Sequence, residues 1–173
     1  MPNLKQEHPE LTQGESHSHR AELLKEAFTM ALYVSICLLA ALTAVSHPDE
    51  EVGAFLIVWG TTLGLAIAHW FAFRVSARLI GAGTIRRHDA DISAAQFGGA
   101  VAVALLATIP MLLLPNAVEF NVVRLTLAGF IGVVGFAVAR VGGASWLRSS
   151  IYGLSILIGA TAVAALKNFL AGH

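Results

Sequence analysis

Residues 52–73 read VGAFLIVWGTTLGLAIAHWFAF, an apolar stretch in which His69 is the one titratable side chain. At ~1.5 Å per residue, a helix of this length can cross a hydrocarbon core of ~30 Å. In lipid the backbone has to satisfy its own hydrogen bonds, so the stretch predicts a transmembrane helix. Four similar stretches cover residues 27–45, 94–114, 122–141 and 151–170. The sequence therefore predicts an all-α integral membrane bundle of five transmembrane helices.

A soluble bundle of very apolar helices is the alternative. Its amphipathic helices would carry charges every few residues, whereas almost every charge in this chain lies between the apolar stretches. The short alternating strands of a membrane β-barrel do not appear. The chain is 56% hydrophobic and 13% charged, with a formal net charge of zero, so we expect no nucleic-acid partner. The lipid bilayer is the expected environment.

Lys and Arg residues concentrate on alternate connections of the predicted bundle. They precede the first span, follow the second and flank the connection after the fourth: Lys5, Arg20, Lys25, Arg74, Arg78, Arg86, Arg87, Arg140 and Arg148. The positive-inside rule then predicts a cytoplasmic N-terminus and an external C-terminus. Arg124 and Lys167 are exceptions near the outer ends of their helices, from which long side chains can reach the interface. We expect residence in a bacterial inner (cytoplasmic) membrane.

Outside the five-helix domain, assigned to residues 21–173, the polar residues 1–20 are expected to form a disordered tail. His8, His17 and His19 lie in this tail, and a His-x-His pair binds a transition metal only where the fold fixes both rings. The lone cysteine, Cys37, lies inside the first span, which excludes an intrachain disulfide and a Cys-rich metal site. We therefore expect no metal and no cofactor.

Small residues recur on one side of the second and fourth spans: Gly60, Gly64 and Ala68, and Gly129, Gly132 and Gly135. Such positions let another helix approach closely, because no side chain holds it off. We favour packing inside the chain's own bundle over an interface between copies. The two are compatible, since a five-helix bundle often needs a partner to complete a pathway. The expected partner is a second copy in a homo-oligomer, or another membrane protein.

Polar side chains within the spans are the candidates for function. The seven-residue spacing of Thr62, His69 and Ser76 puts them on one face of the second helix. The other candidates lie near the cytoplasmic end of that helix and along the first and fifth helices: Arg74, Tyr33, Cys37, Tyr152 and Ser155. If these stripes face one another, they form a polar seam in which an imidazole can relay protons or bind a cation. The alternative is that His69 bonds a neighbouring helix and serves packing alone.

Missing features narrow the function further. No Asp or Glu lies in the middle of a span, and the motifs of metalloproteases, serine hydrolases and phosphate-binding loops are absent. We therefore do not expect an enzyme. The polar stripes favour a small transporter or channel-like protein that moves a cation or proton. The missing carboxylates favour the alternative, a non-transporting membrane scaffold or regulatory subunit of a partner complex.

Three segments of the second half carry a family likeness. They are residues 109–114 (IPMLLL), residues 135–143, and residues 146–150 (WLRSS) leading into residues 158–160 (IGA). These segments resemble the vacuolar iron transporter family of five-helix membrane proteins, mainly over residues 94–170. The resemblance implies five spans in the same orientation. The family's acidic residue in the first span, and its Met and Glu in the second, have no counterpart here, so the resemblance assigns no metal-ligating residue.

Overall fold

The structure is a computed structural model that describes residues 8–45, 53–80 and 87–170. Within these residues the chain forms five helices: α1 (His8–Ala44), α2 (Ala54–Ile80), α3 (Arg87–Leu113), α4 (Asn116–Val141) and α5 (Trp146–Leu170). All five are long and apolar enough to cross a membrane. The predicted all-α architecture is therefore confirmed, and large apolar side chains such as Ile67 (64% exposed) and Val133 (65% exposed) face outward, as lipid contact requires.

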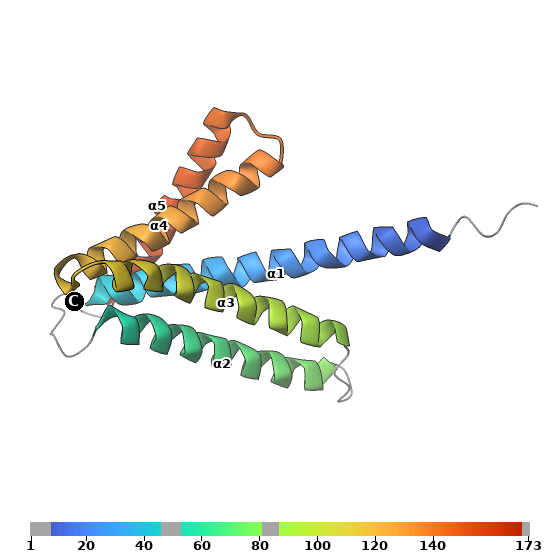
Figure 1. Ribbon diagram of the computed structural model, residues 1–173, viewed down its shortest axis with the longest axis horizontal. Helices are drawn as coiled ribbons and strands as arrows, with labels where there is room; N and C mark the ends of the chain where they lie inside the picture. The colour runs from blue at the N-terminus through green and yellow to red at the C-terminus, as the bar shows by residue number, and fades with distance from the viewer. Residues whose placement is uncertain (1–7, 46–52, 81–86, 171–173) are drawn as a thin grey trace, which may run out of the picture.

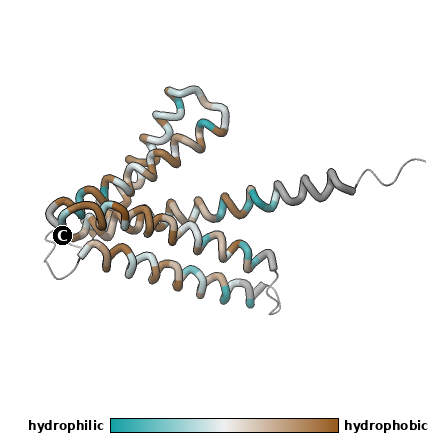
Figure 2. Tube along the Cα trace, viewed as in Figure 1, coloured by the Kyte–Doolittle hydropathy of each residue, from teal (hydrophilic) through white to brown (hydrophobic). Residues whose placement is uncertain are grey.

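The helices converge at one end of the molecule and spread apart at the other (Figure 1). The converged end holds the last turns of α1, α3 and α5 and the first turns of α2 and α4. At the spread end α2 and α3 diverge from α1, and the hairpin of α4 and α5 stands away from all three. Figure 2 shows that the converged half is the more hydrophobic and that polar residues gather toward the spread ends. By the charge rule, the spread end is the one predicted to face the cytoplasm.

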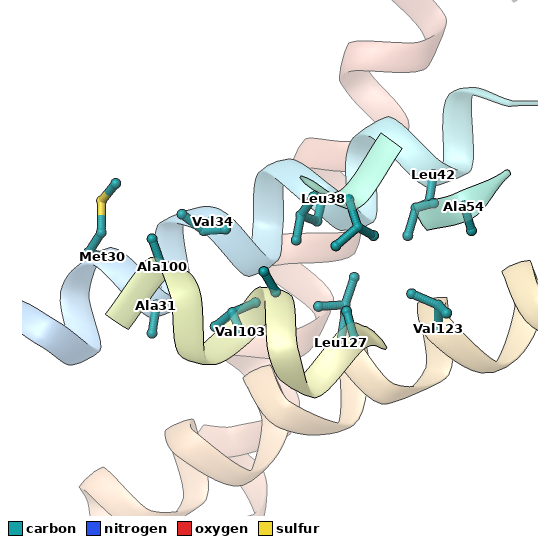
Figure 3. Close-up of a cluster of buried hydrophobic side chains, with 13 residues drawn as sticks. Met30, Ala31, Val34, Leu38, Leu42, Ala54, Ala100, Val103, Val123 and Leu127 are labelled. Atoms are coloured by element: carbon teal, nitrogen blue, oxygen red, sulfur yellow. The ribbon is translucent and has the colours of Figure 1, made fainter. Parts of the chain in front are cut away.

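An apolar cluster holds the converged half together (Figure 3). Four of its members, Val34 and Leu38 of α1, Val103 of α3 and Leu127 of α4, are almost fully buried and face one another across the three helices. In lipid, close packing rather than removal from water supplies most of the stabilisation between helices. Buried polar side chains also occur on these helices, among them Ser35 of α1, which donates to the carbonyl oxygen of Ala31, and Thr62 of α2.

Two pairs of helices approach closely at glycines. A Cβ at Gly99 of α3 would collide with the backbone carbonyl oxygen of Ala27 in α1 and would lie 2.9 Å from its carbonyl carbon. A Cβ at Gly135 of α4 would lie 3.1 Å from the Cα of Gly153 in α5. The absence of side chains at these positions therefore sets the distances between α1 and α3 and between α4 and α5.

Most of the remaining small residues pack differently from the expectation that they serve the chain's own bundle. Gly132 fits that expectation, because a Cβ at Gly153 of α5 would lie 2.8 Å from the carbonyl oxygen of Gly132. A Cβ at Gly60, Gly64 or Gly129 would meet nothing within 4 Å, and Ala68 is exposed. The stripe on α2 thus points away from the described bundle, because α2 contacts α1 and α3 with its opposite side.

α1 is much longer than a membrane crossing requires. Its 37 residues correspond to ~55 Å at the usual helical rise, and its first part protrudes beyond the spread ends of the other helices (Figure 1). Residues 8–20 are thus helical where the sequence led us to expect a disordered tail; residues 1–7 lie outside the described residues. Extending an existing helix avoids the cost of nucleation, and the Glu, Gln and Leu residues of this segment favour helix.

Arg124 of α4 ties the converged end to α1. Its Nε donates a hydrogen bond to the carbonyl oxygen of Leu42 over 3.1 Å, and its Nη2 donates to Leu42 and, over 3.2 Å, to Val45. Carbonyl groups in the last turn of a helix have no partner inside the helix, and a cation is favourable there. Arg124 therefore satisfies the end of α1 instead of only extending to the interface.

Candidate functional site

Three polar side chains form a hydrogen-bonded chain across three helices in the spread half. Nε2 of Gln96 in α3 donates to Oε2 of Glu26 in α1 over 2.8 Å, and Nε2 of His69 in α2 lies 3.0 Å from Oε1 of Gln96. Because an ionised carboxylate only accepts hydrogen bonds, Gln96 must turn its amino group to Glu26 and its carbonyl oxygen to His69. Nε2 of His69 is then the donor, and in the neutral imidazole Nδ1 is left as the acceptor.

This chain borders a cavity of about 430 Å³ between α2 and α3, next to α1. Polar groups in its lining come from His69, Ser93 and Gln96. The rest of the lining is apolar: Met30, Ala66, Ile67, Trp70, Phe73, Ala94 and Phe97. The Ser93 hydroxyl is used within its own helix, since it donates to the carbonyl oxygen of Asp89 over 2.9 Å. A volume of this size and such a lining are typical of sites for small amphipathic molecules.

Arg74 lies beside the cavity, one helical turn beyond Trp70. Its guanidinium carbon is 4.9 Å from the centre of the Trp70 ring, which is the geometry of a cation–π contact. Trp70 itself lines the cavity. The contact therefore holds a positive charge against a residue of the cavity wall, while the N–H groups of Arg74, which lie in the guanidinium plane, keep the ability to donate.

The structure separates the predicted stripe on α2. Thr62 is 1% exposed in the converged half, and its hydroxyl has no hydrogen-bond partner among the described residues. His69 and Ser76 are exposed in the spread half. The seven-residue spacing does place the three on one face of the helix, but that face is buried only near the converged end, since α1 diverges from α2 toward the spread end (Figure 1). A shared helix face is therefore not a shared environment here.

The two other stripes lie apart from this one. Tyr33, which is 49% exposed, interacts with the half-buried Cys37 on the same helix. Tyr152 and Ser155 are exposed near the start of α5, in the hairpin that stands away from α1, α2 and α3 (Figure 1). Ser155 donates within its own helix. The described part of the chain therefore does not bring the three stripes together as one seam.

Sequence reasoning missed two members of the hydrogen-bonded chain, Glu26 and Gln96. Glu26 immediately precedes the predicted first span, and Gln96 is the third residue of the predicted third span. An amide inside an apolar stretch is a usable signal, because an unpaired amide in hydrocarbon is costly. The sequence could not predict which side chains Gln96 would bond, because Glu26 lies 70 positions and His69 27 positions away in the chain.

Metal ligation has no evident site in the residues that the structure describes, which contain no group of three or more His, Cys, Asp or Glu suited to hold an ion. His19, from the predicted tail, instead lies in α1 with its Nε2 3.7 Å from the Asp91 carboxylate of α3. The side chains of His8 and His17 lie outside the described residues.

Comparisons of the chain with protein-family models, with curated proteins and with solved structures find no match.

Proposed function

We propose that the chain is a small integral membrane transporter of the bacterial inner membrane, which moves a proton or small cation and uses His69 as the group that takes up charge. The observation that carries this proposal is the chain of hydrogen bonds from Glu26 through Gln96 to His69. It places a carboxylate and an imidazole on either side of one amide, at the edge of a cavity in an apolar bundle. Ionisable groups in such a setting are costly and are typically functional.

The geometry accommodates both charge states of His69. In the neutral ring, Nε2–H donates to Gln96 and Nδ1 is an acceptor. In the imidazolium, the Nε2–H bond is kept and Nδ1 becomes a second donor. The negative charge of Glu26, at the far side of the amide, favours a cation at this place. Imidazole is also the side chain whose ordinary charge change falls in the physiological pH range.

The arrangement of the helices supports access from one side. The apolar cluster closes the converged half, whereas the cavity beside His69 lies in the spread half. With the orientation that the charge rule predicts, His69 is reached from the cytoplasm. Transport then requires a second state in which the spread ends close and the converged ends part, as in alternating access. We propose that α2 moves in this step, because it packs least against the rest of the described bundle, whereas Gly99 fixes α3 against α1.

A non-transporting scaffold or regulatory subunit of a partner complex is the second candidate. The apolar cluster in the converged half favours it, because its closely packed side chains offer no ligand to an ion. The open positions at Gly60 and Gly64 also favour it, since a partner helix or a second copy can approach there. Under this alternative, the hydrogen bonds of His69 only hold α1, α2 and α3 together.

Flux into sealed vesicles distinguishes the two functions. The purified chain is reconstituted in vesicles that enclose a dye sensitive to protons, sodium or potassium, and a gradient of the ion that the dye reports is imposed. A transporter gives flux above that of protein-free vesicles. His69→Ala, His69→Phe and Gln96→Leu should lower it to the level of empty vesicles, whereas Ser150→Ala should match wild type, because that exposed hydroxyl bonds only its own helix.

Two results contradict the proposal. If wild-type vesicles show no flux with any of these gradients, transport of a proton or small cation is refuted and the scaffold stands. If flux exists and survives His69→Phe and Gln96→Leu in variants that melt like wild type, the pathway does not include the hydrogen-bonded chain.

A further inference from the structure

The cavity between α2 and α3 is lined mostly by apolar side chains. Because α2 runs toward the spread end, Ala66 and Ile67 line the part nearer the converged end, while Trp70 and Phe73 line the part nearer the spread end. The distance from Ala66 to Phe73 along the helix is ~10 Å, against a hydrocarbon thickness of ~15 Å for one leaflet. In length and in apolar lining, the cavity therefore suits the upper part of a lipid acyl chain.

Two arginines follow the cavity-lining part of α2 toward its C-terminal end. Arg74 and Arg78 are four residues apart and so lie on the same side of α2, one turn from each other. Both are exposed, and Arg74 is held against Trp70. The carboxylates of Glu26 and Asp91 keep their charge but lie on α1 and α3, where Gln96 and His19 approach them. On α2, the charge that is available for an anionic ligand is therefore that of the two arginines.

We propose that this cavity binds an anionic phospholipid from the leaflet that faces Arg74. Its phosphate accepts hydrogen bonds from the guanidinium of Arg74, and one acyl chain lies in the apolar part against Met30, Ala66 and Phe97. The proposal rests on insertion in a membrane and does not depend on transport. The cavity adjoins the outward-facing Ile67 and Phe97, so a lipid can enter from the bilayer without passing through water.

The physics of this site sets the selectivity that it should show. Moving an acyl chain from the bilayer into an apolar groove gains little, because both surroundings are hydrocarbon. Discrimination must therefore come from the headgroup, where a guanidinium binds an anionic phosphate in a charge-assisted, two-pronged arrangement. A zwitterionic headgroup carries its own cation and competes poorly for Arg74.

Contact quenching of Trp70 tests the site, because brominated acyl chains quench indole fluorescence only at close range. The chain has three tryptophans, so Trp59→Phe together with Trp146→Phe leaves Trp70 alone. This variant is reconstituted in phosphatidylcholine vesicles that contain a small fixed fraction of brominated phosphatidylglycerol, or the same fraction of brominated phosphatidylcholine. We expect stronger quenching by the anionic lipid. A second variant that keeps only Trp59, which hydrogen-bonds Thr108 in the converged half, should show no preference.

Substitutions then locate the headgroup and the acyl chain. Arg74→Gln should remove the preference of Trp70 for the anionic lipid, and Arg74→Lys should keep part of it, because the charge remains without the planar fork. Ala94→Leu places bulk in the cavity lining and should reduce the preference. Ala72→Leu, at an exposed position of α2 outside the lining, is the matched control and should leave it unchanged.

Equal quenching of Trp70 by the two brominated lipids overturns the proposal, as does a preference that survives Arg74→Gln in full. Inorganic phosphate in the buffer distinguishes a site for a soluble anion from a site for a phospholipid. If the two brominated lipids quench equally while phosphate in the buffer shifts the emission of Trp70 and Arg74→Gln removes that shift, the site belongs to a soluble anion and the assignment to lipid is wrong. If the preference persists in phosphate, a phospholipid is the ligand.

Discussion

Replacing Gly99 by Ala should force α1 and α3 apart, and the neighbouring Gly98 provides a matched control. A Cβ at Gly99 meets backbone atoms of Ala27, which cannot rotate away, whereas a Cβ at Gly98 meets nothing within 4 Å. The carbonyl carbon of Ala27 would lie 2.9 Å from the new methyl group, while ordinary contacts begin at 3.4 Å. The helices would therefore have to separate by about 0.5 Å or more at this point.

The comparison of the two variants isolates the packing energy. Both gain the same helix propensity, ~1 kcal/mol for Ala over Gly, so this contribution cancels. Overpacking commonly costs ~1–3 kcal/mol, and we expect Gly99→Ala to be less stable than Gly98→Ala by that amount. The site should also respond, because Gln96 precedes Gly99 by three residues and Glu26 adjoins Ala27. Their 2.8 Å hydrogen bond is expected to lengthen or break.

Unfolding by SDS in mixed micelles, followed by tryptophan fluorescence, gives the two free energies of unfolding. The side-chain nitrogen signals of His69 in an NMR spectrum report the state of the hydrogen-bonded chain. They should shift in Gly99→Ala and stay in place in Gly98→Ala. A Gly99→Ala variant as stable as Gly98→Ala, with unshifted His69 signals, would refute the close contact between α1 and α3 and the argument built on it.

Three further predictions follow from the topology and the packing. In a background that lacks the native cysteine, a cysteine at position 49 should react with a membrane-impermeant reagent on intact cells and one at position 87 should not; the reverse pattern contradicts the orientation. Gly64→Leu should leave the melting temperature of the isolated chain unchanged, since its Cβ position is open, whereas Gly135→Leu should lower it, because the new side chain meets the backbone of α5. Equal melting of these two variants contradicts the assignment of faces. Arg124→Gln should lower the free energy of unfolding by ~1–3 kcal/mol, because carbonyl groups at the end of α1 lose a charged donor; an unchanged value in the same SDS titration contradicts that role.

The apolar stretches were sufficient to predict five helices, because in hydrocarbon each helix satisfies its own backbone whatever its neighbours are. They were less informative about where α1 begins. Composition alone led us to expect a disordered tail for residues 1–20, yet the helix starts at His8. The reason is that a polar segment next to a stable helix is extended from it rather than nucleated anew. A prediction of disorder from the composition of residues 1–20 does not include the influence of the helix that follows them.

For the candidate site, the sequence by itself singled out His69, as the only His within an apolar span. Helical periodicity also placed Thr62 and Ser76 on its face, but periodicity orders the faces of one helix and does not say which faces meet. That was decided by the packing of separate helices: the close approach of Gly99 to Ala27 brings α3 against α1, and Gln96 then lies between His69 and Glu26. The helices converge around Thr62 and bury it, and they diverge toward His69 and Ser76, which are exposed. Only the tertiary structure could supply these pairings, because each depends on contacts between residues far apart in the chain.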